Sequence, residues 1–155
     1  MDKLELYRLA LAAELRSQEL YRTLARSYLH PETSAFFNEL VRLEKIHEEK
    51  LRKAFARDFP GQRLEAEVKL GHELKELDLT DPQVLLEFAL SREELAQSHY
   101  LDFAAQAGDP ELKNLLQHLA NEEEQHKTLL LEEMSRIQGA LQWFDPSELT
   151  GLMED

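Results

Sequence analysis

With 155 residues, the chain is long enough for one domain with a sizeable core and too short for two ordinary domains. Its formal net charge of −13 argues against binding to nucleic acid or to an anionic membrane, because both rely on Lys and Arg contacts to phosphate. The absence of cysteine excludes disulfides, thiolate zinc sites, iron–sulfur clusters and rubredoxin-type iron sites.

The apolar residues recur at helical spacing nearly throughout, and the first half of the chain contains two long helical patterns. The first pattern covers about residues 2–28. The second begins at Pro31, which suits the first turn of a helix, and ends at Pro60-Gly61. Residues 60–80 then form a connection, in which we expect a short helical piece around residues 64–77.

The second half repeats this organisation. Asp81 is the expected cap of the third helix, with Pro82 in the first turn. The sequence Gly108-Asp109-Pro110 closes the third helix and starts the fourth, which we expect to end near Gly139. Two further patterns are missing: acidic residues interrupt any signal-peptide pattern, and no run approaches the ~20 apolar residues of a membrane span. We therefore expect a cytoplasmic protein.

These elements predict an all-α fold. Short joints make the first and second helices, and the third and fourth, antiparallel hairpins, and the long middle link can run the length of the bundle. The expected fold is a four-helix bundle of residues 1–140, followed by a short C-terminal segment of residues 141–155. We expect that segment to fold onto the bundle or a second subunit, or to dock a partner.

An internal repeat is the main clue to function. Residues 10–51 can be laid over residues 89–130 at a constant offset of 79 without a gap. The matches include polar side chains that lie on otherwise apolar helix stripes, where a plain core excludes them. On these stripes the matched polar pairs, with one tyrosine pair, are Glu14/Glu93, Gln18/Gln97, Tyr21/Tyr100, Glu44/Glu123 and His47/His126.

Four glutamates that converge inside one bundle need compensating charge. Two carboxylates about 4 Å apart repel by ~4 kcal/mol even at an effective dielectric constant of about 20. Two divalent cations would cancel the four negative charges, and Glu-x-x-His spacing brings both side chains of a pair to one helix face. Carboxylate and imidazole ligands without thiolate favour iron or manganese over structural zinc. The predicted metal ligands are Glu14, Glu44, His47, Glu93, Glu123 and His126.

The sequence resembles the rubrerythrin-like branch of the ferritin-like superfamily over about residues 4–138. The matching segments are Glu14–Tyr21, Leu43–His47, Glu93–Tyr100 and Glu122–His126. The resemblance implies a ferritin-like four-helix bundle with two iron ions, manganese being the alternative metal. It also implies that Glu44 and Glu123 bridge the metals, while Glu14 with His47, and Glu93 with His126, complete one metal shell each. Tyr21 and Tyr100 would then donate hydrogen bonds to ligand carboxylates.

Two departures separate the chain from rubrerythrins proper. Their additional glutamate, one turn after the third-helix ligand, is Ala96 here, and their rubredoxin domain needs cysteines that this chain lacks. The resemblance still implies an oxidoreductase that reduces hydrogen peroxide or dioxygen with electrons from a separate donor protein, and a homodimer. The alternatives are a ferroxidase subunit of an iron-storage assembly, a non-catalytic metal-binding module, or a bundle without metal.

Several polar residues near the proposed ligands are expected to have no metal role. Four glutamates lie next to residues of the apolar stripes in sequence, and we expect them to point about 100° away from the stripes, into solvent. They are Glu19, Glu94, Glu122 and Glu124. His30, His72, His99 and His118 have no matching partner in the repeat and are expected at the surface or in packing. Gln18 and Gln97 either line the site or lie at its edge.

Overall fold

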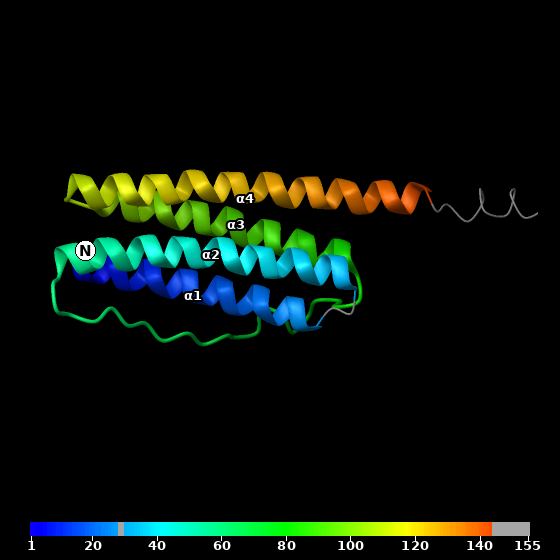
Figure 1. Cartoon of the computed structure of the whole chain (residues 1–155), viewed down its shortest axis with the longest axis horizontal. Coiled ribbons are helices and arrows are strands. Elements are labelled where there is room, and N and C mark those ends of the chain that lie inside the picture. The colour runs from blue at the N-terminus through cyan, green and yellow to red at the C-terminus, as the bar shows by residue number, and fades with distance from the viewer. Residues whose placement is uncertain (28–29, 144–155) are drawn as a thin grey trace, which may run out of the picture.

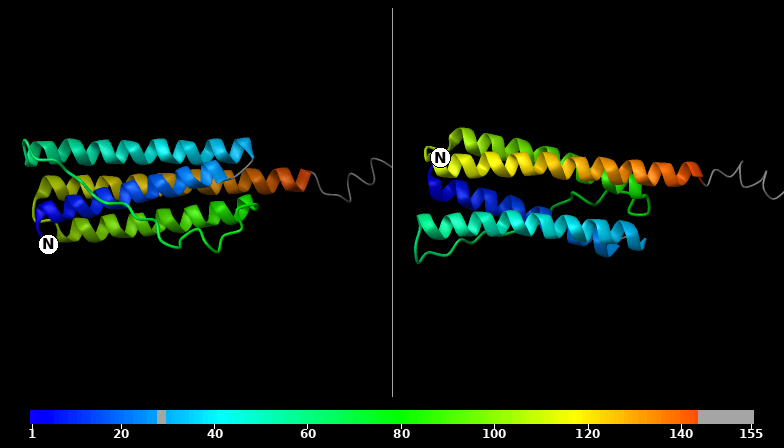
Figure 2. Two further views of the ribbon diagram at one scale, coloured as in Figure 1. Left: turned by 90° about the horizontal axis from the view of Figure 1, so that it is seen from below. Right: turned by 45° about the horizontal axis from the view of Figure 1, so that its top comes forward.

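The computed structural model describes residues 1–27 and 30–143, and helices are the only regular elements in these two ranges. The bounds of the four helices are α1 Lys3–Ser27, α2 Pro31–Asp58, α3 Pro82–Gln106 and α4 Pro110–Trp143. Helices α1 and α2 pack together as one antiparallel hairpin, and α3 and α4 form the other (Figure 1). Residues 59–81 run along the bundle from the end of α2 to the start of α3 (Figure 2). The predicted all-α bundle of two hairpins joined by a long crossover is confirmed.

The third helix starts as its sequence predicts. Asp81 adopts an extended backbone conformation, and its side chain accepts a hydrogen bond of 3.0 Å from the backbone N–H of Gln83. Pro82 occupies the first turn, where a missing N–H has no cost. Prolines open α2 and α4 in the same way, so three of the four helix starts are fixed by sequence.

Two expectations about helical segments are wrong. Residues 62–72 of the crossover contain no helix, and residues 73–76 form only turns, so the helical piece expected around residues 64–77 is absent. Leu64 is buried against the core while Leu70 is exposed, so this segment packs as an irregular strap. Gly139 does not end the fourth helix, which continues to Trp143. A helix interior tolerates one glycine at a cost of only ~1 kcal/mol. Residues 144–155, which hold most of the expected C-terminal segment, lie outside the described residues.

The core is divided into two apolar clusters. One lies toward the start of α1 and includes Leu11, Leu51 and Tyr100, while the other includes Tyr21 and Leu40. Between them, the stripes of all four helices carry polar side chains instead of apolar ones. The buried polar residues of this layer include Glu14, Gln18, Glu44, His47, Glu93, Glu123 and His126.

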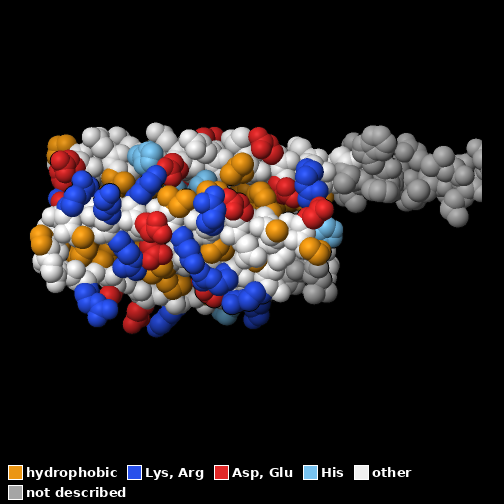
Figure 3. All heavy atoms as spheres, viewed as in Figure 1, with side chains coloured by type: hydrophobic (Ala, Val, Ile, Leu, Met, Phe, Trp, Pro, Cys, Tyr) orange, Lys and Arg blue, Asp and Glu red, His pale blue; other side chains and the backbone are white. Residues whose placement is uncertain are grey.

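Figure 3 shows the face of the molecule that carries α2 and α4, on which Lys and Arg side chains, carboxylates and small apolar patches are interspersed. The net negative charge of the chain is therefore not concentrated as one acidic patch on this face. None of the four helices, over the residues that the structure describes, has a stretch apolar and long enough to cross a membrane.

Candidate metal centre

One glutamate from each helix lies in the polar layer between the two apolar clusters. Helix positions three and four residues apart share one face, so the stripe that buries Leu11 and Leu40 also carries glutamates into the interior. None of the four is more than 2% exposed. They are Glu14 on α1, Glu44 on α2, Glu93 on α3 and Glu123 on α4.

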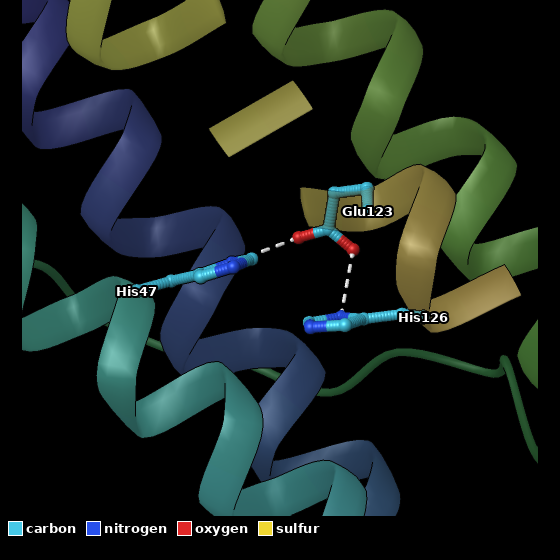
Figure 4. A group of neighbouring side chains, drawn as sticks. All are labelled: His47, Glu123 and His126. Carbon is cyan, nitrogen blue, oxygen red and sulfur yellow. Dashed lines mark ion pairs between the residues drawn. The ribbon is translucent and has the colours of Figure 1, made fainter. Parts of the chain in front are cut away.

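Two histidines lie beside these carboxylates. His47 and His126 each follow a glutamate by three residues, and their imidazole rings stack with centroids 4.9 Å apart and an interplanar angle of 13°. The carboxylate of Glu123 faces both rings, with one oxygen directed at each (Figure 4). Its Oε1 is 3.0 Å from His47 Nδ1, and its Oε2 is 3.4 Å from His126 Nδ1. Both histidines therefore turn Nδ1 toward the cluster.

The six side chains form two overlapping groups of four. Within each group, one potential ligand atom from every residue lies within 4.8 Å of the others. The groups are Glu14, Glu44, His47 and Glu123, and Glu44, Glu93, Glu123 and His126. Glu44 and Glu123 belong to both. A pair of cations that share two carboxylates fits this arrangement, and the structure brings together all six residues that the repeat singled out.

Two buried tyrosines hold the outer glutamates. The hydroxyl of Tyr21 donates a hydrogen bond of 2.8 Å to Glu93 Oε1, and the hydroxyl of Tyr100 donates one to Glu14 Oε1. Each tyrosine thus crosses to the glutamate of the other half of the repeat. Burial raises the pKa of both phenols well above 10, and the negative charges of Glu44 near Tyr21 and of Glu14 near Tyr100 raise the pKa values further. The hydroxyls therefore remain protonated donors.

Several carboxylate oxygens in the cluster lack a hydrogen-bond partner although they are fully buried. They are Oε2 of Glu14, Oε2 of Glu93, and both oxygens of Glu123. Glu123 approaches both imidazoles, but without the geometry of a hydrogen bond. A buried carboxylate oxygen without a partner costs free energy that a protein rarely leaves uncompensated. Cations between the oxygens would supply that compensation.

The cluster holds protons when no metal neutralises it. Burial raises the pKa of the Glu14 carboxyl well above 4.5, and the charge of Glu44 raises it further. Burial alone would lower the pKa of His126, but the carboxylates of Glu123 and Glu44 outweigh burial and raise it from 6.5 to about 9. The pKa of His47 is raised for the same reason, because Glu123 and Glu14 outweigh burial. A metal ion that binds here must displace these protons.

Comparison with known proteins identifies the family. A family model described as rubrerythrin matches residues 5–83 and again residues 84–151, which together cover nearly the whole chain. The chain belongs to the rubrerythrin family. The two segments that match the rubrerythrin model start at residues 5 and 84. These starts are 79 residues apart, which is the offset of the internal repeat. None of the curated proteins matches the chain significantly.

Solved structures share the ferritin-like fold of this rubrerythrin-family chain. A hypothetical protein from Pyrococcus furiosus is 27% identical with a TM-score of 0.68, and the match covers 90% of this chain and 92% of that one. An uncharacterised conserved protein from Magnetospirillum magnetotacticum is 23% identical with a TM-score of 0.70, covering 88% and 95%. A bacterioferritin from Rhodobacter capsulatus is 22% identical with a TM-score of 0.66, covering 87% and 84%. The ferritin-like connectivity expected from the sequence is confirmed.

One residue beside the rubrerythrin-family cluster escaped the sequence analysis. Glu122 was expected to point into solvent, but its side chain is only 19% exposed and its Oε2 lies 2.7 Å from His47 Nε2. On α4 the side chain of Glu122 does point about 100° away from that of Glu123, as expected. In the bundle, however, this direction leads to α2 and not to water. The sequence carries no signal for this contact, because most pairs of the repeat differ and Glu122/Leu43 is only one of them.

The other neighbours take no part in the cluster. Glu124 is 59% exposed and pairs with Lys127, and Glu19 pairs with Arg22 on the surface of α1. Gln18 is buried, yet its amide donates a hydrogen bond of 2.9 Å to Glu48 Oε1 rather than to any of the six clustered residues. Gln18 therefore lies at the edge of the site.

Proposed function

We propose that the protein is a di-iron oxidoreductase that reduces hydrogen peroxide or dioxygen with electrons from a separate donor protein. The proposed ligands of one iron are Glu14 and His47, those of the other are Glu93 and His126, and Glu44 and Glu123 serve both. The observation that carries the proposal is the set of buried carboxylate oxygens without a hydrogen-bond partner in the polar layer. Two of these oxygens belong to Glu123.

The donor set fits two divalent ions. Four carboxylates bring four negative charges into a layer that is closed above and below by apolar clusters, and two divalent ions carry four positive charges. Imidazole and carboxylate without thiolate suit iron or manganese. Magnesium, which keeps several waters and prefers oxygen ligands, suits a buried histidine-containing site poorly.

Two bound iron ions would supply one electron each, which matches the two-electron reduction of peroxide to water. The protein's own residues provide position and a restricted supply of water. Tyr21 and Tyr100 fix the carboxylates of Glu93 and Glu14 through their hydroxyls, so these side chains cannot swing out of the layer. Leu40 and Leu51, each fully buried, lie one helical turn on either side of the Glu44–His47 pair and exclude water from it.

The remaining parts of the proposal come from the composition and the family. Without cysteine, the chain has no rubredoxin-type iron site of its own, so we propose that electrons come from another protein. Peroxide is the first choice of oxidant because of the likeness to rubrerythrins. A homodimer and a cytoplasmic location complete the proposal.

The test is anaerobic oxidation of the protein loaded with two equivalents of ferrous iron. We expect rapid oxidation by hydrogen peroxide that is complete at about one peroxide per two irons, because each peroxide accepts two electrons. Glu123→Ala should slow this reaction by a factor of about 100 or more, since it removes both oxygens of one of the two shared ligands. Glu124→Ala is the matched control. The side chain of Glu124 is exposed and pairs with Lys127, so its removal should leave the rate unchanged.

Slow oxidation that is equally slow in Glu123→Ala would contradict the proposal. Fast oxidation by dioxygen, with iron in large excess of two per chain and a hollow assembly of many subunits, would identify an iron-storage subunit instead. Size measurement of the purified protein separates these outcomes, because a dimer cannot enclose a mineral core.

A further inference from the structure

The two halves of the repeat differ beside their histidines. His47 Nε2, the ring nitrogen that faces away from the cluster, lies 2.7 Å from Glu122 Oε2 across the interface of α2 and α4. Subtracting the repeat offset of 79 from 122 gives position 43, and the residue there is Leu43. The equivalent position near His126 therefore carries an apolar side chain instead of a carboxylate.

Glu122 is itself held in place. Its Oε1 contacts the ammonium group of Lys50 and lies 2.5 Å from His118 Nε2, one turn earlier on α4. Lys50 Nζ is also 3.0 Å from His118 Nε2, which closes a small polar network between α2 and α4. Lys50 and His118 are 37% and 53% exposed, so the network leads from His47 to the surface.

The environment of His126 is different. Leu43 and Leu129 line the groove beside it, and the same groove reaches Lys50 and Glu122 and includes Gln125 and Thr128. Leu129 is the repeat equivalent of Lys50, again 79 residues apart. Nδ1 of His126 faces Glu44 at 3.1 Å, as Nδ1 of His47 faces Glu14 at 3.2 Å. Within residues 1–27 and 30–143, however, no hydrogen-bond partner lies at Nε2 of His126.

A carboxylate behind a histidine changes what the ring can do. When Nε2–H donates to a carboxylate, the proton stays on Nε2, and Nδ1 is left as a lone-pair ligand in a fixed orientation. The negative charge also makes Nδ1 a better electron donor, and loss of such a partner costs typically about 10–100-fold in metal affinity. His47 has this partner, whereas no residue that the structure describes bonds Nε2 of His126.

We infer that Glu122 is a positioning residue for His47 and that it makes the two metal positions unequal. The position that uses Glu14 and His47 binds its ion first and more tightly, and the position that uses Glu93 and His126 fills second. The inference rests on the proposed function only in that the six residues bind two ions; it does not depend on the reaction that the ions perform.

Titration with cobalt(II), followed by its visible absorption, tests the order of filling without any assay of activity. The wild-type chain should bind two ions in two steps, with affinities that differ by a factor of about 10 or more. His126→Ala should keep the tight step and lose the weak one. His47→Ala should do the opposite.

Three substitutions then test Glu122 directly. Glu122→Leu, which copies the residue at the equivalent position, should weaken the first step about 10-fold or more and merge the two steps. Glu122→Gln keeps an acceptor oxygen for Nε2–H and should retain part of the difference. Leu43→Glu leaves Glu122 intact and gives His126 a carboxylate, so it should tighten the second step by a factor of about 10 and leave the first unchanged. Far-UV circular dichroism checks that each variant is folded.

Equal affinities for the two ions in the wild type, or a Leu43→Glu variant whose second step does not tighten, would overturn the inference. Both results leave two bound ions per chain, so the proposed di-iron function would survive them. A wild-type chain that binds no cobalt(II), by contrast, would overturn the proposed function itself.

Discussion

Removal of iron by a chelator from protein that has been loaded with two equivalents of iron is expected to lower the melting temperature by roughly 10–30 °C. A ligand present at 100–1,000 times its dissociation constant stabilises the folded state by about 3–4 kcal/mol per site. Two sites double that figure, and a chain of this size gains about 2–4 °C per kcal/mol. Thermal unfolding of loaded and chelated samples, followed by circular dichroism, measures the difference.

The effect of iron removal should also depend on pH. The pKa of His126 in the metal-free fold is raised to about 9 from an ordinary value of 6.5. A raised pKa stabilises the folded state below pH 6.5, and this contribution is lost as the pH rises through about 9. The raised pKa of His47 acts in the same direction. The metal-free protein should therefore lose stability between pH 6.5 and 9, while the loaded protein, whose imidazoles are unprotonated, should not. If the melting temperatures of the loaded and the metal-free protein differed by the same amount at every pH in this range, the metal-free cluster would not hold the protons that we assign to it.

Substitution of Glu123 by methionine should destroy metal binding and, at neutral pH, destabilise the metal-free protein by about 3–5 kcal/mol, because His47 and His126 lose the carboxylate that faces both of them. Glu123 is fully buried, and neither of its oxygens makes a hydrogen bond. Removing one partner of a buried ion pair is strongly destabilising, because the charge that stays behind has lost its compensation. Methionine has a similar length, favours helix and fits irregular spaces. Urea unfolding of the metal-free proteins measures the change in the free energy of unfolding.

Two comparisons make this second prediction specific. Glu124→Met removes an exposed carboxylate next along α4 and should change the free energy of unfolding by no more than about 0.5 kcal/mol. The chelator should no longer shift the melting temperature of Glu123→Met, because a shared ligand of both ions is gone. A metal-free Glu123→Met protein that is as stable as the wild type, or more stable, would show that the two imidazoles do not depend on this carboxylate in the absence of metal.

Much of the fold follows from the sequence because its signals are local and repeated. Pro31, Pro82 and Pro110 start three helices, and the two hairpins follow from their short joints. The errors lie where tertiary packing decides. Residues 64–77 have a weak apolar pattern, but one buried residue, Leu64, is enough to anchor an irregular strap. Gly139 is open to solvent on one side, so the helix continues through it at small cost.

The candidate site was predictable for a different reason. A carboxylate on an apolar stripe is costly to bury, so it indicates a function. The repeat contains two such pairs, Glu14 with Glu93 and Glu44 with Glu123. Glu122 could not be found in this way, because its place depends on how α4 faces α2. A helix considered alone gives the direction of a side chain but not what lies in that direction.

Anomalous X-ray scattering at the iron edge, from crystals of the iron-loaded protein, tests the central claim most directly. Two peaks per chain are predicted, both in the layer between the apolar clusters, with Glu44 and Glu123 contacting both ions and with one histidine at each. A single peak at the surface, or an empty layer with the six side chains turned toward solvent, would contradict the account.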